Sequence, residues 1–294
     1  MSEPLPTRYP GLSSFTTAQK DIFFGRTQET FDLFNFISLE RMVVLFSKSG
    51  YGKTSLLQAG LIPLLYDHRM TPVLIRFGTD KANPEWHFKS QFEETYFRFM
   101  GVDARAEAAL AENETFWAQI RRCPFVNGDD RFTPLFIFDQ FEELFTLYPD
   151  QQRRQRFITE LADLIQGQLP ESLHEEILLR LISRDISDQE AAEMEQVPPM
   201  KFIFSIRSDM LHFLDELSKP IPRILDARYQ LFGLSEQQAE DAIVEPAKLG
   251  TETIAQMNGS SMPLRFLSPP FGFEPSAKTE ILSTLIKNDE VESF

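Results

Sequence analysis

The sequence predicts an α/β protein in which a mostly parallel sheet is covered by helices on both faces and is followed by a short helical segment. Four short apolar runs alternate with segments of helical periodicity, and none of the four shows the polar alternation of a half-exposed strand. The 294 residues, 42% hydrophobic and 25% charged, suit one large globular core with or without an appendage.

The first predicted elements surround a glycine-containing loop. Apolar residues at helical spacing predict a helix over 27–39, and the run 42–46 has the composition of a strand buried on both faces. A second helix is expected over 54–65, with Pro63 near its end. The loop at 47–53 therefore lies between a buried strand and a helix, which is the context that a phosphate-binding loop requires.

The remaining elements continue the alternation. Strands are predicted over 73–77, 134–139 and 201–206, and helices over 85–100, 103–121 and 150–166. An acidic segment over 171–196 ends at a Val-Pro-Pro break. After residue 231 we expect the strands to cease, because the pattern there turns helical.

Composition and charge exclude several functional classes. The net charge of −15 argues against a general affinity for DNA or RNA. Cys123 is the only cysteine, so an internal disulfide and a thiolate metal cluster are both excluded. The N-terminus lacks a signal-peptide pattern, and no apolar stretch approaches the roughly 18 residues that span a bilayer. We therefore expect a cytoplasmic protein with no membrane partner.

The loop after the first predicted strand has the residues of a phosphate-binding site. Gly50 and Gly52 would let the backbone approach a phosphate closely at the start of a helix. Lys53 is placed to reach the β- and γ-phosphates, and the Thr54 hydroxyl is a ligand for Mg²⁺. Ser47 stands where the pattern has glycine, and a small residue can replace that glycine if no positive φ is needed.

Two further strand ends carry candidate catalytic groups. Asp139 ends the third predicted strand, where ligands of open α/β sheets bind, and it can hold Mg²⁺ or its water shell. A neighbouring carboxylate, Glu143 or Glu142, could orient the attacking water. Arg207 ends the fourth strand; its guanidinium could contact the γ-phosphate or form an ion pair with Asp209.

An ordered series of motifs over about residues 9–250 resembles the novel STAND class of P-loop NTPases. The motifs are Tyr9-Pro10-Gly11-Leu12; Phe23-Phe24-Gly25-Arg26 with Glu29; Ser49-Gly50-Tyr51-Gly52-Lys53-Thr54-Ser55 with Ala59-Gly60-Leu61; Asp139-Gln140-Phe141-Glu142-Glu143; Ile206-Arg207-Ser208-Asp209; and Leu234-Ser235 with Pro246-Ala247. The last of these is similar to the segment that leads into the helical lid of the family. The order of the motifs makes the resemblance stronger than any one of them.

The resemblance implies an ATP site whose parts can be named. Residues 139–145 would form Walker B, and 205–209 the end of the sensor-1 strand. In this family a glycine-arginine pair upstream of the phosphate loop helps to seat the adenine. The implied nucleotide ligands are therefore Phe24, Gly25, Arg26, Ser49, Gly50, Tyr51, Gly52, Lys53, Thr54 and Ser55, with Thr54 and Asp139 as ligands of Mg²⁺.

The resemblance also implies a P-loop NTPase fold and a function. It predicts an adenine-side segment over 1–26, the NTPase core over 27–230 and a helical lid or the start of a further domain over 231–294. Members of this additional-strand group are slow ATPase switches that bind ATP or ADP, oligomerise and activate an effector, and many bacterial members act in antiphage defence. Here the NTPase-like sequence begins within about ten residues and stops at Phe294, so effector and sensor would lie in partners or in missing sequence.

Three other functions compete with a hydrolysing switch. A nucleotide-dependent scaffold that binds ATP or ADP with little hydrolysis fits the same motifs and differs only in turnover. A small-molecule kinase would need a lid with phosphate-clamping arginines, which the sequence does not indicate. A GTPase would carry an Asn-Lys-x-Asp signature, and this sequence has none.

Overall fold

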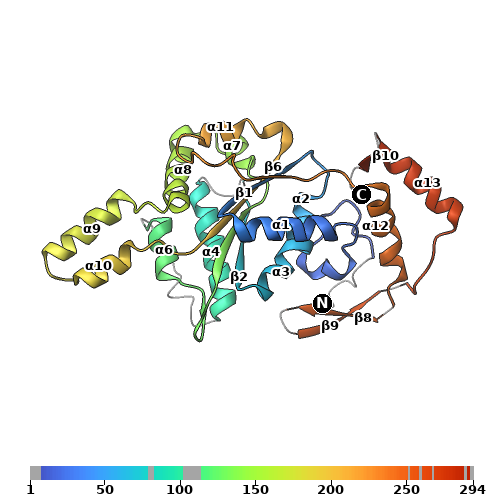
Figure 1. Ribbon diagram of the computed structural model, residues 1–294, viewed down its shortest axis with the longest axis horizontal. Coiled ribbons are helices and arrows are strands. Elements are labelled where there is room, and N and C mark those ends of the chain that lie inside the picture. Colours follow the sequence, from blue (N-terminus) through green and yellow to red (C-terminus); the bar gives the residue numbers. More distant parts are fainter. Residues whose placement is uncertain are drawn as a thin grey trace. The chain divides into compact units, whose positions relative to one another are not determined.

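The computed structural model describes residues 8–78, 83–101, 114–250, 252–257, 260–266, 268–287 and 290–291 (Figure 1). The chain divides into two compact units. The first unit comprises residues 1–39, 45–68 and 229–294, and the second comprises 40–44 and 69–228. In the described part of the chain no helix is both long and apolar enough to cross a membrane.

A five-stranded sheet orders the strand ends that carry the candidate residues. Its strands are β1 (Met42–Ser47), β2 (Met70–Ile75), β5 (Thr133–Phe138), β6 (Lys201–Arg207) and β7 (Arg228–Gln230), in the order β2-β5-β6-β1-β7. β5 is parallel to both β2 and β6. β6 thus stands between β1, the strand before the phosphate loop, and β5, the strand before Asp139. The predicted mostly parallel α/β fold is confirmed.

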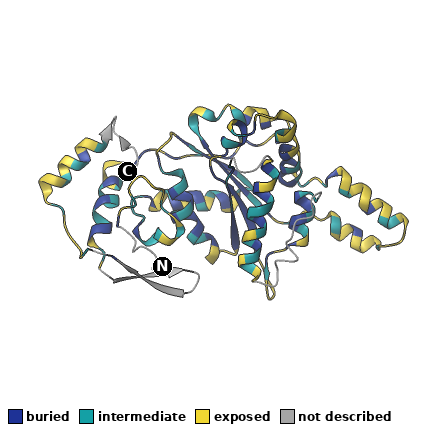
Figure 2. Cartoon of the chain, turned by 180° about the vertical axis from the view of Figure 1, so that it is seen from behind, coloured by how far each residue is buried: buried dark blue, intermediate teal, exposed yellow. Residues whose placement is uncertain are grey.

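The second unit has an aromatic core around β5 and β6. All four residues 135–138 are fully buried, which explains why this strand shows no polar alternation (Figure 2). The Phe138 and Phe204 rings stack across the two strands with their centroids 5.1 Å apart. Phe88 of α4 (Pro84–Met100) stacks on Phe136 at 5.0 Å. Many of the phenylalanines therefore form the core, as aromatic residues within apolar runs predict.

The other elements of the second unit are shorter. They are α6 (Phe116–Arg122), β3 (Val126–Asn127), β4 (Asp130–Arg131), α7 (Glu143–Thr146), α8 (Gln151–Gln166), α9 (Glu171–Ile182), α10 (Asp188–Glu195), the 3-10 helix η4 (Ser208–Met210) and α11 (Phe213–Leu217). The acidic segment forms the pair α9 and α10, which are mostly exposed. Of the helix predicted over 103–121, residues 103–113 lie outside the described residues, and the rest begins at Phe116.

The first unit carries the phosphate loop and the helices around it. The 3-10 helix η1 (Thr17–Ile22) precedes α1 (Thr27–Leu39), whose predicted bounds are confirmed. After the loop come α2 (Lys53–Ser55), the π-helical turn η2 (Leu56–Leu61) and α3 (Ile62–Asp67). The three form one continuous helical run from Lys53 to Asp67, and Pro63 lies in its last segment, α3, near the end of the run as predicted. Pro63 has no N–H for the helical ladder, and the preceding N–H, that of Ile62, bonds to the Leu57 carbonyl five residues back.

The strands do not cease after residue 231, so that prediction was wrong. α12 (Glu236–Lys248) and α13 (Pro275–Leu285) are helical as expected, but β8 (Glu252–Met257) pairs antiparallel with β9 (Ser260–Arg265). A second short pair joins β10 (Ile286–Lys287) to β11 (Glu290–Val291). The sequence signal that we passed over is the Asn-Gly dipeptide between β8 and β9, which favours a two-residue hairpin connection. The division of the chain at residues 26 and 230 stays a prediction.

Candidate nucleotide site

The phosphate loop has the backbone conformation that its glycines allow. Gly50 and Gly52 have φ angles of +83° and +85°, which residues with a side chain adopt only under strain. Gly52 is the N-cap of α2, so the loop leads directly into the first turn of a helix. A helix start of this kind presents N–H groups to an anion. The loop can therefore receive a phosphate on its backbone.

Ser47 fits the loop without the conformation that only glycine tolerates. It is not among the described residues with a positive φ, and its side chain is buried. Its hydroxyl donates to the Lys48 carbonyl at 2.9 Å and accepts from the Lys53 ammonium at 3.1 Å. The same ammonium also lies 3.3 Å from the Ser47 carbonyl oxygen. Ser47 thus holds Lys53 over the loop, and the replacement of glycine does not distort the backbone.

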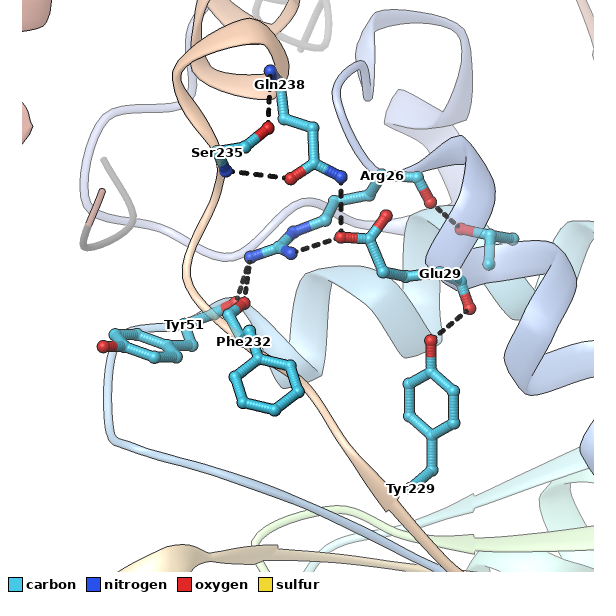
Figure 3. Close-up of polar contacts among 8 residues, drawn as sticks. Arg26, Glu29, Tyr51, Tyr229, Phe232, Ser235 and Gln238 are labelled. Carbon is cyan, nitrogen blue, oxygen red and sulfur yellow. Dashed lines mark hydrogen bonds and ion pairs between the residues drawn. The ribbon is translucent and has the colours of Figure 1, made fainter. Parts of the chain in front are cut away.

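A buried arginine fixes the back of the loop (Figure 3). Arg26 is only 5% exposed, and its Nη2 donates to the carbonyl oxygens of Tyr51 at 3.1 Å and Phe232 at 2.9 Å. Its Nη1 pairs with Glu29 Oε1 at 2.6 Å. Since Tyr51 belongs to the loop and Phe232 to the segment that enters α12, Arg26 ties these two parts of the first unit together.

The start of α12 completes this network. Glu29 Oε1 also accepts a hydrogen bond from Gln238 Nε2 at 2.9 Å. Gln238 is the third residue of α12, and it forms a capping box with Ser235, whose backbone N–H donates to Gln238 Oε1 at 2.9 Å. Gly25 has a φ of +82°, and a Cβ on it would lie 2.4 Å from the Gln238 carbonyl oxygen. Gly25 and Arg26 therefore pack directly on the first turn of α12.

Three residues of this neighbourhood differ from the prediction: Tyr229 and Gln238 were not predicted, and Ser55 was expected to bind the nucleotide. The Tyr229 hydroxyl lies 3.5 Å from the Glu29 carbonyl oxygen, and burial raises the pKa of Tyr229 to about 12, with the charges of Asp32 and Glu29 adding to it. The Ser55 hydroxyl accepts a hydrogen bond from the Phe15 N–H at 3.1 Å. The Ser-x-x-Gln spacing at the start of α12 was the signal that could have revealed Gln238 as a capping residue.

The second unit holds the acidic strand end. Asp139 follows β5 and is 1% exposed. Its Oδ2 accepts two hydrogen bonds from Arg76, from Nε at 3.1 Å and from Nη2 at 2.6 Å. Arg76 directly follows β2, the neighbour of β5 in the sheet. Sequence reasoning missed Arg76, although a cation at the end of an apolar strand was visible.

The turn after Asp139 is held by both neighbouring strands. The Asp139 N–H donates to the Ile75 carbonyl at 3.0 Å, and the Phe141 N–H donates to the Ser205 carbonyl at 2.8 Å. Between them Gln140 has a φ of +59°, a conformation that is uncommon for a residue with a side chain. Such outliers cluster at functional sites, where the surroundings hold them in place.

Glu142 and Glu143 follow at the start of α7. Glu142 is buried and Glu143 is half-buried. Burial raises the pKa of Glu143, the charges of Glu142 and Asp139 raise it further, and Arg76 opposes the shift. A carboxylate with a raised pKa is a better proton acceptor, as a general base requires.

Arg207 forms the ion pair that the sequence offered as its alternative role. Its Nε donates to Asp209 Oδ1 at 3.1 Å, and its Nη2 donates to Oδ2 at 2.6 Å. The Arg207 side chain is 40% exposed, so solvent and ligands can reach it.

The predicted site residues thus form two groups. Phe24, Gly25, Arg26 and residues 49–55 lie in the first unit, and Asp139, Glu142, Glu143 and Arg207 lie in the second. The Thr54 hydroxyl in the first unit and the Asp139 carboxylate in the second each offer an oxygen atom, which is the kind of ligand that Mg²⁺ takes. Among the described residues no group of three or more His, Cys, Asp or Glu could hold a metal.

Comparison with solved structures found distant similarity. The Walker-type ATPase paby2304 of Pyrococcus abyssi is 13% identical with a TM-score of 0.49, and the match covers 81% of this chain and 60% of that one. Aeropyrum pernix ORC2, in ADPNP-ADP complexes, is 13% identical with a TM-score of 0.44 and coverages of 75% and 50%. Aeropyrum pernix ORC1, in complex with DNA, is 13% identical with a TM-score of 0.42 and coverages of 81% and 52%. The chain thus spans about half to three fifths of these proteins.

Comparison with family models gave a broader match. No curated protein sequence matches the chain. The model of Novel STAND NTPase 1, however, matches residues 8–258, which include the phosphate loop, the acidic strand end and α12. The chain belongs to the Novel STAND NTPase 1 family.

Proposed function

We propose that the chain binds ATP or ADP with Mg²⁺ and hydrolyses ATP slowly. The observation that carries this proposal is the phosphate loop, with its two positive-φ glycines and its lysine at the start of a helix, in a chain of an NTPase family. The acidic strand end with Asp139 and Glu143 supports hydrolysis rather than binding alone.

Each candidate residue has a role in this proposal. The loop N–H groups and Lys53 would bind the β- and γ-phosphates, and Thr54 and Asp139 would hold Mg²⁺, which supplies charge neutralisation on the phosphate oxygens. Glu143, with Glu142 as the alternative, would accept a proton from the attacking water. Arg207 would contact the γ-phosphate after leaving Asp209. Catalysis would rest on positioning and charge stabilisation.

The adenine is proposed to lie near Phe24 and Gly25. The Arg26 guanidinium is buried and bonded to two carbonyls and a carboxylate. We infer that Arg26 is a positioning residue, which holds the loop and the α12 segment. The adenine would contact residues around Arg26 rather than the Arg26 guanidinium.

A switch between nucleotide states is the proposed use of the ATPase. The family supports this proposal, and so do the hydrogen bonds that join Tyr51, Arg26, Glu29 and Gln238. Through them, movement of the loop backbone at Tyr51 would displace the start of α12. Self-association or an effector or sensor partner would read that change. A role in antiphage defence and a cytoplasmic location are part of the same proposal.

The second candidate is the scaffold that binds nucleotide with little turnover. One observation favours it: Asp139 and Arg207 are both in ion pairs, with Arg76 and Asp209, which must open before either can act on a nucleotide.

Single-turnover measurement separates the two candidates. The protein is mixed in excess over radiolabelled ATP with Mg²⁺, and bound ATP and ADP are separated at each time. The switch predicts that bound ATP is converted to ADP, and that Lys53→Ala abolishes binding. ATP that stays bound but unchanged for hours would favour the scaffold, and a failure of the parent protein to bind ATP would contradict both candidates.

A further inference from the structure

Arg76 pairs with Asp139, the carboxylate that would bind Mg²⁺ in the proposed function. Arg76 Nε and Nη2 both donate to one oxygen, Asp139 Oδ2, at 3.1 and 2.6 Å. The Asp139 side chain is 1% exposed and the Arg76 side chain is 42% exposed. The pair therefore consists of an almost fully buried anion and a cation that reaches it from the solvent side.

A buried carboxylate needs a positive partner. A charge that is buried without a partner destabilises the folded protein, because it has lost its hydration and gained nothing in exchange. In the protein without metal, Arg76 supplies this charge. Mg²⁺ would supply it in the loaded protein, because a carboxylate oxygen is the ligand that this ion prefers.

The backbone of Arg76 is fixed while its head group can move. The Arg76 N–H donates to Gln91 Oε1 at 2.9 Å, and Gln91 Nε2 donates to the Arg76 carbonyl at 2.9 Å. Gln91 therefore holds both backbone groups of this residue to α4. An exchange of partners at Asp139 would then need only rotation of the exposed Arg76 side chain into water, with no change of the sheet.

We propose that Arg76 and Mg²⁺ compete for Asp139, so that loading of the metal with nucleotide releases Arg76. This inference rests on the proposed function. Arg76 is then a positioning residue that keeps the Asp139 side chain ordered before loading, and it makes metal binding weaker than the carboxylate alone would give. Removing the Arg76 side chain should therefore lower the stability of the metal-free protein and raise the affinity of Asp139 for the metal.

The first test is stability without metal. In EDTA, Arg76→Gln should lower the thermal midpoint by several degrees, because the Asp139 carboxylate loses the positive charge and the two hydrogen bonds of Arg76. The double variant Arg76→Gln with Asp139→Asn should recover most of this loss. The matched control is Arg98→Gln, which breaks the exposed pair with Glu94 and should leave the midpoint unchanged. A midpoint for Arg76→Gln equal to that of the parent would overturn the counter-ion role.

The second test is metal affinity, measured with Mn²⁺ in place of Mg²⁺. Free Mn²⁺ is followed by electron paramagnetic resonance as it is titrated into protein with ADP. Arg76→Gln should bind Mn²⁺ at least fivefold more tightly than the parent, whereas Arg98→Gln should match the parent. Equal or weaker binding by Arg76→Gln would overturn the competition and leave the proposed ATPase standing. A parent that binds no Mn²⁺ with ADP would overturn both.

Discussion

Gly25 shows how one residue without a side chain decides the packing behind the phosphate loop. Its φ is +82°, and a Cβ would meet the Gln238 carbonyl oxygen at 2.4 Å. The contacting atom belongs to the backbone of a capped helix, so it cannot rotate away as a side chain could. The neighbouring Arg26 and Glu29 depend on the same close approach, because Glu29 bonds to the Gln238 side chain.

Gly25→Ala should therefore destabilise the protein more than a positive φ alone explains. Gly11→Ala is the matched control, since Gly11 also has a positive φ, +69°, but has nothing within 4 Å of an added Cβ. We expect Gly11→Ala to lower the free energy of unfolding by about 1 to 2 kcal/mol, and Gly25→Ala to lower it further. Urea titration of both variants measures the difference, and equal losses would show that the contact with Gln238 is not restrictive.

At the level of helices and strands, the sequence predicted the elements whose apolar residues recur with a clear helical or strand spacing. The helix over 27–39 and the buried strands were recoverable, because apolar spacing reports which faces are covered. The π-helical turn at Leu56–Leu61 was not, because it depends on how Pro63 shifts the hydrogen bonds of its neighbours. The partners of Arg76 and Arg26 were also beyond reach, since they join residues 63 and 206 positions apart.

The link between the loop and α12 can be tested at Arg26. Arg26→Lys keeps the charge but loses the planar fork that reaches two carbonyls and a carboxylate. We expect a loss of about 2 kcal/mol in stability and weaker ADP binding, because the Tyr51 carbonyl loses its donor. Arg8→Lys is the control, as Arg8 is equally buried and holds the carbonyls of Pro246 and Leu249 in the same unit. Arg8→Lys should lose stability but bind ADP as tightly as the parent does, which calorimetry measures. If Arg26→Lys and Arg8→Lys bind ADP equally well, Arg26 has no role in shaping the loop for the nucleotide.

The packing of α6 on α8 should carry a pH dependence. Glu160 of α8 accepts a hydrogen bond from the Phe116 N–H at 2.8 Å, and burial is the main cause that raises the pKa of Glu160. A pKa raised above the unfolded value means that this carboxyl favours folding below the unfolded pKa of about 4.3. The contribution is lost as the pH rises through the folded pKa.

Glu160→Gln should remove this dependence, because an amide oxygen can still accept from Phe116 and carries no charge. The variant should therefore be more stable than the parent at pH 7 to 8, with the gap closing toward pH 4. Thermal unfolding across that range measures the gap. Glu175→Gln, an exposed change on α9, serves as the control and should follow the parent curve. A variant less stable than the parent at pH 8 would contradict the burial argument.

For the whole molecule, the order of strands connects the sequence with the proposed activity. β1 leads into the phosphate loop, β5 leads into Asp139, and β6 between them leads into Arg207. The phosphate loop, Asp139 and Arg207 could be predicted from the sequence alone, because each directly follows an apolar run. The sequence offered the pair of Arg207 with Asp209 as one of two roles. It did not indicate that Arg76 would pair with Asp139, and we did not predict the antiparallel pair of β8 and β9 after α12.

The proposed ATPase requires Lys53 to bind the phosphates and Glu143 to accept a proton from the attacking water. Steady-state phosphate release with Mg²⁺-ATP tests it most directly, in the parent, Lys53→Ala, Glu143→Gln and Glu142→Gln. We predict slow release by the parent, a loss of at least tenfold in Lys53→Ala and in Glu143→Gln, and a smaller loss in Glu142→Gln. Equal release by the parent, Lys53→Ala and Glu143→Gln would show that neither residue takes part in hydrolysis.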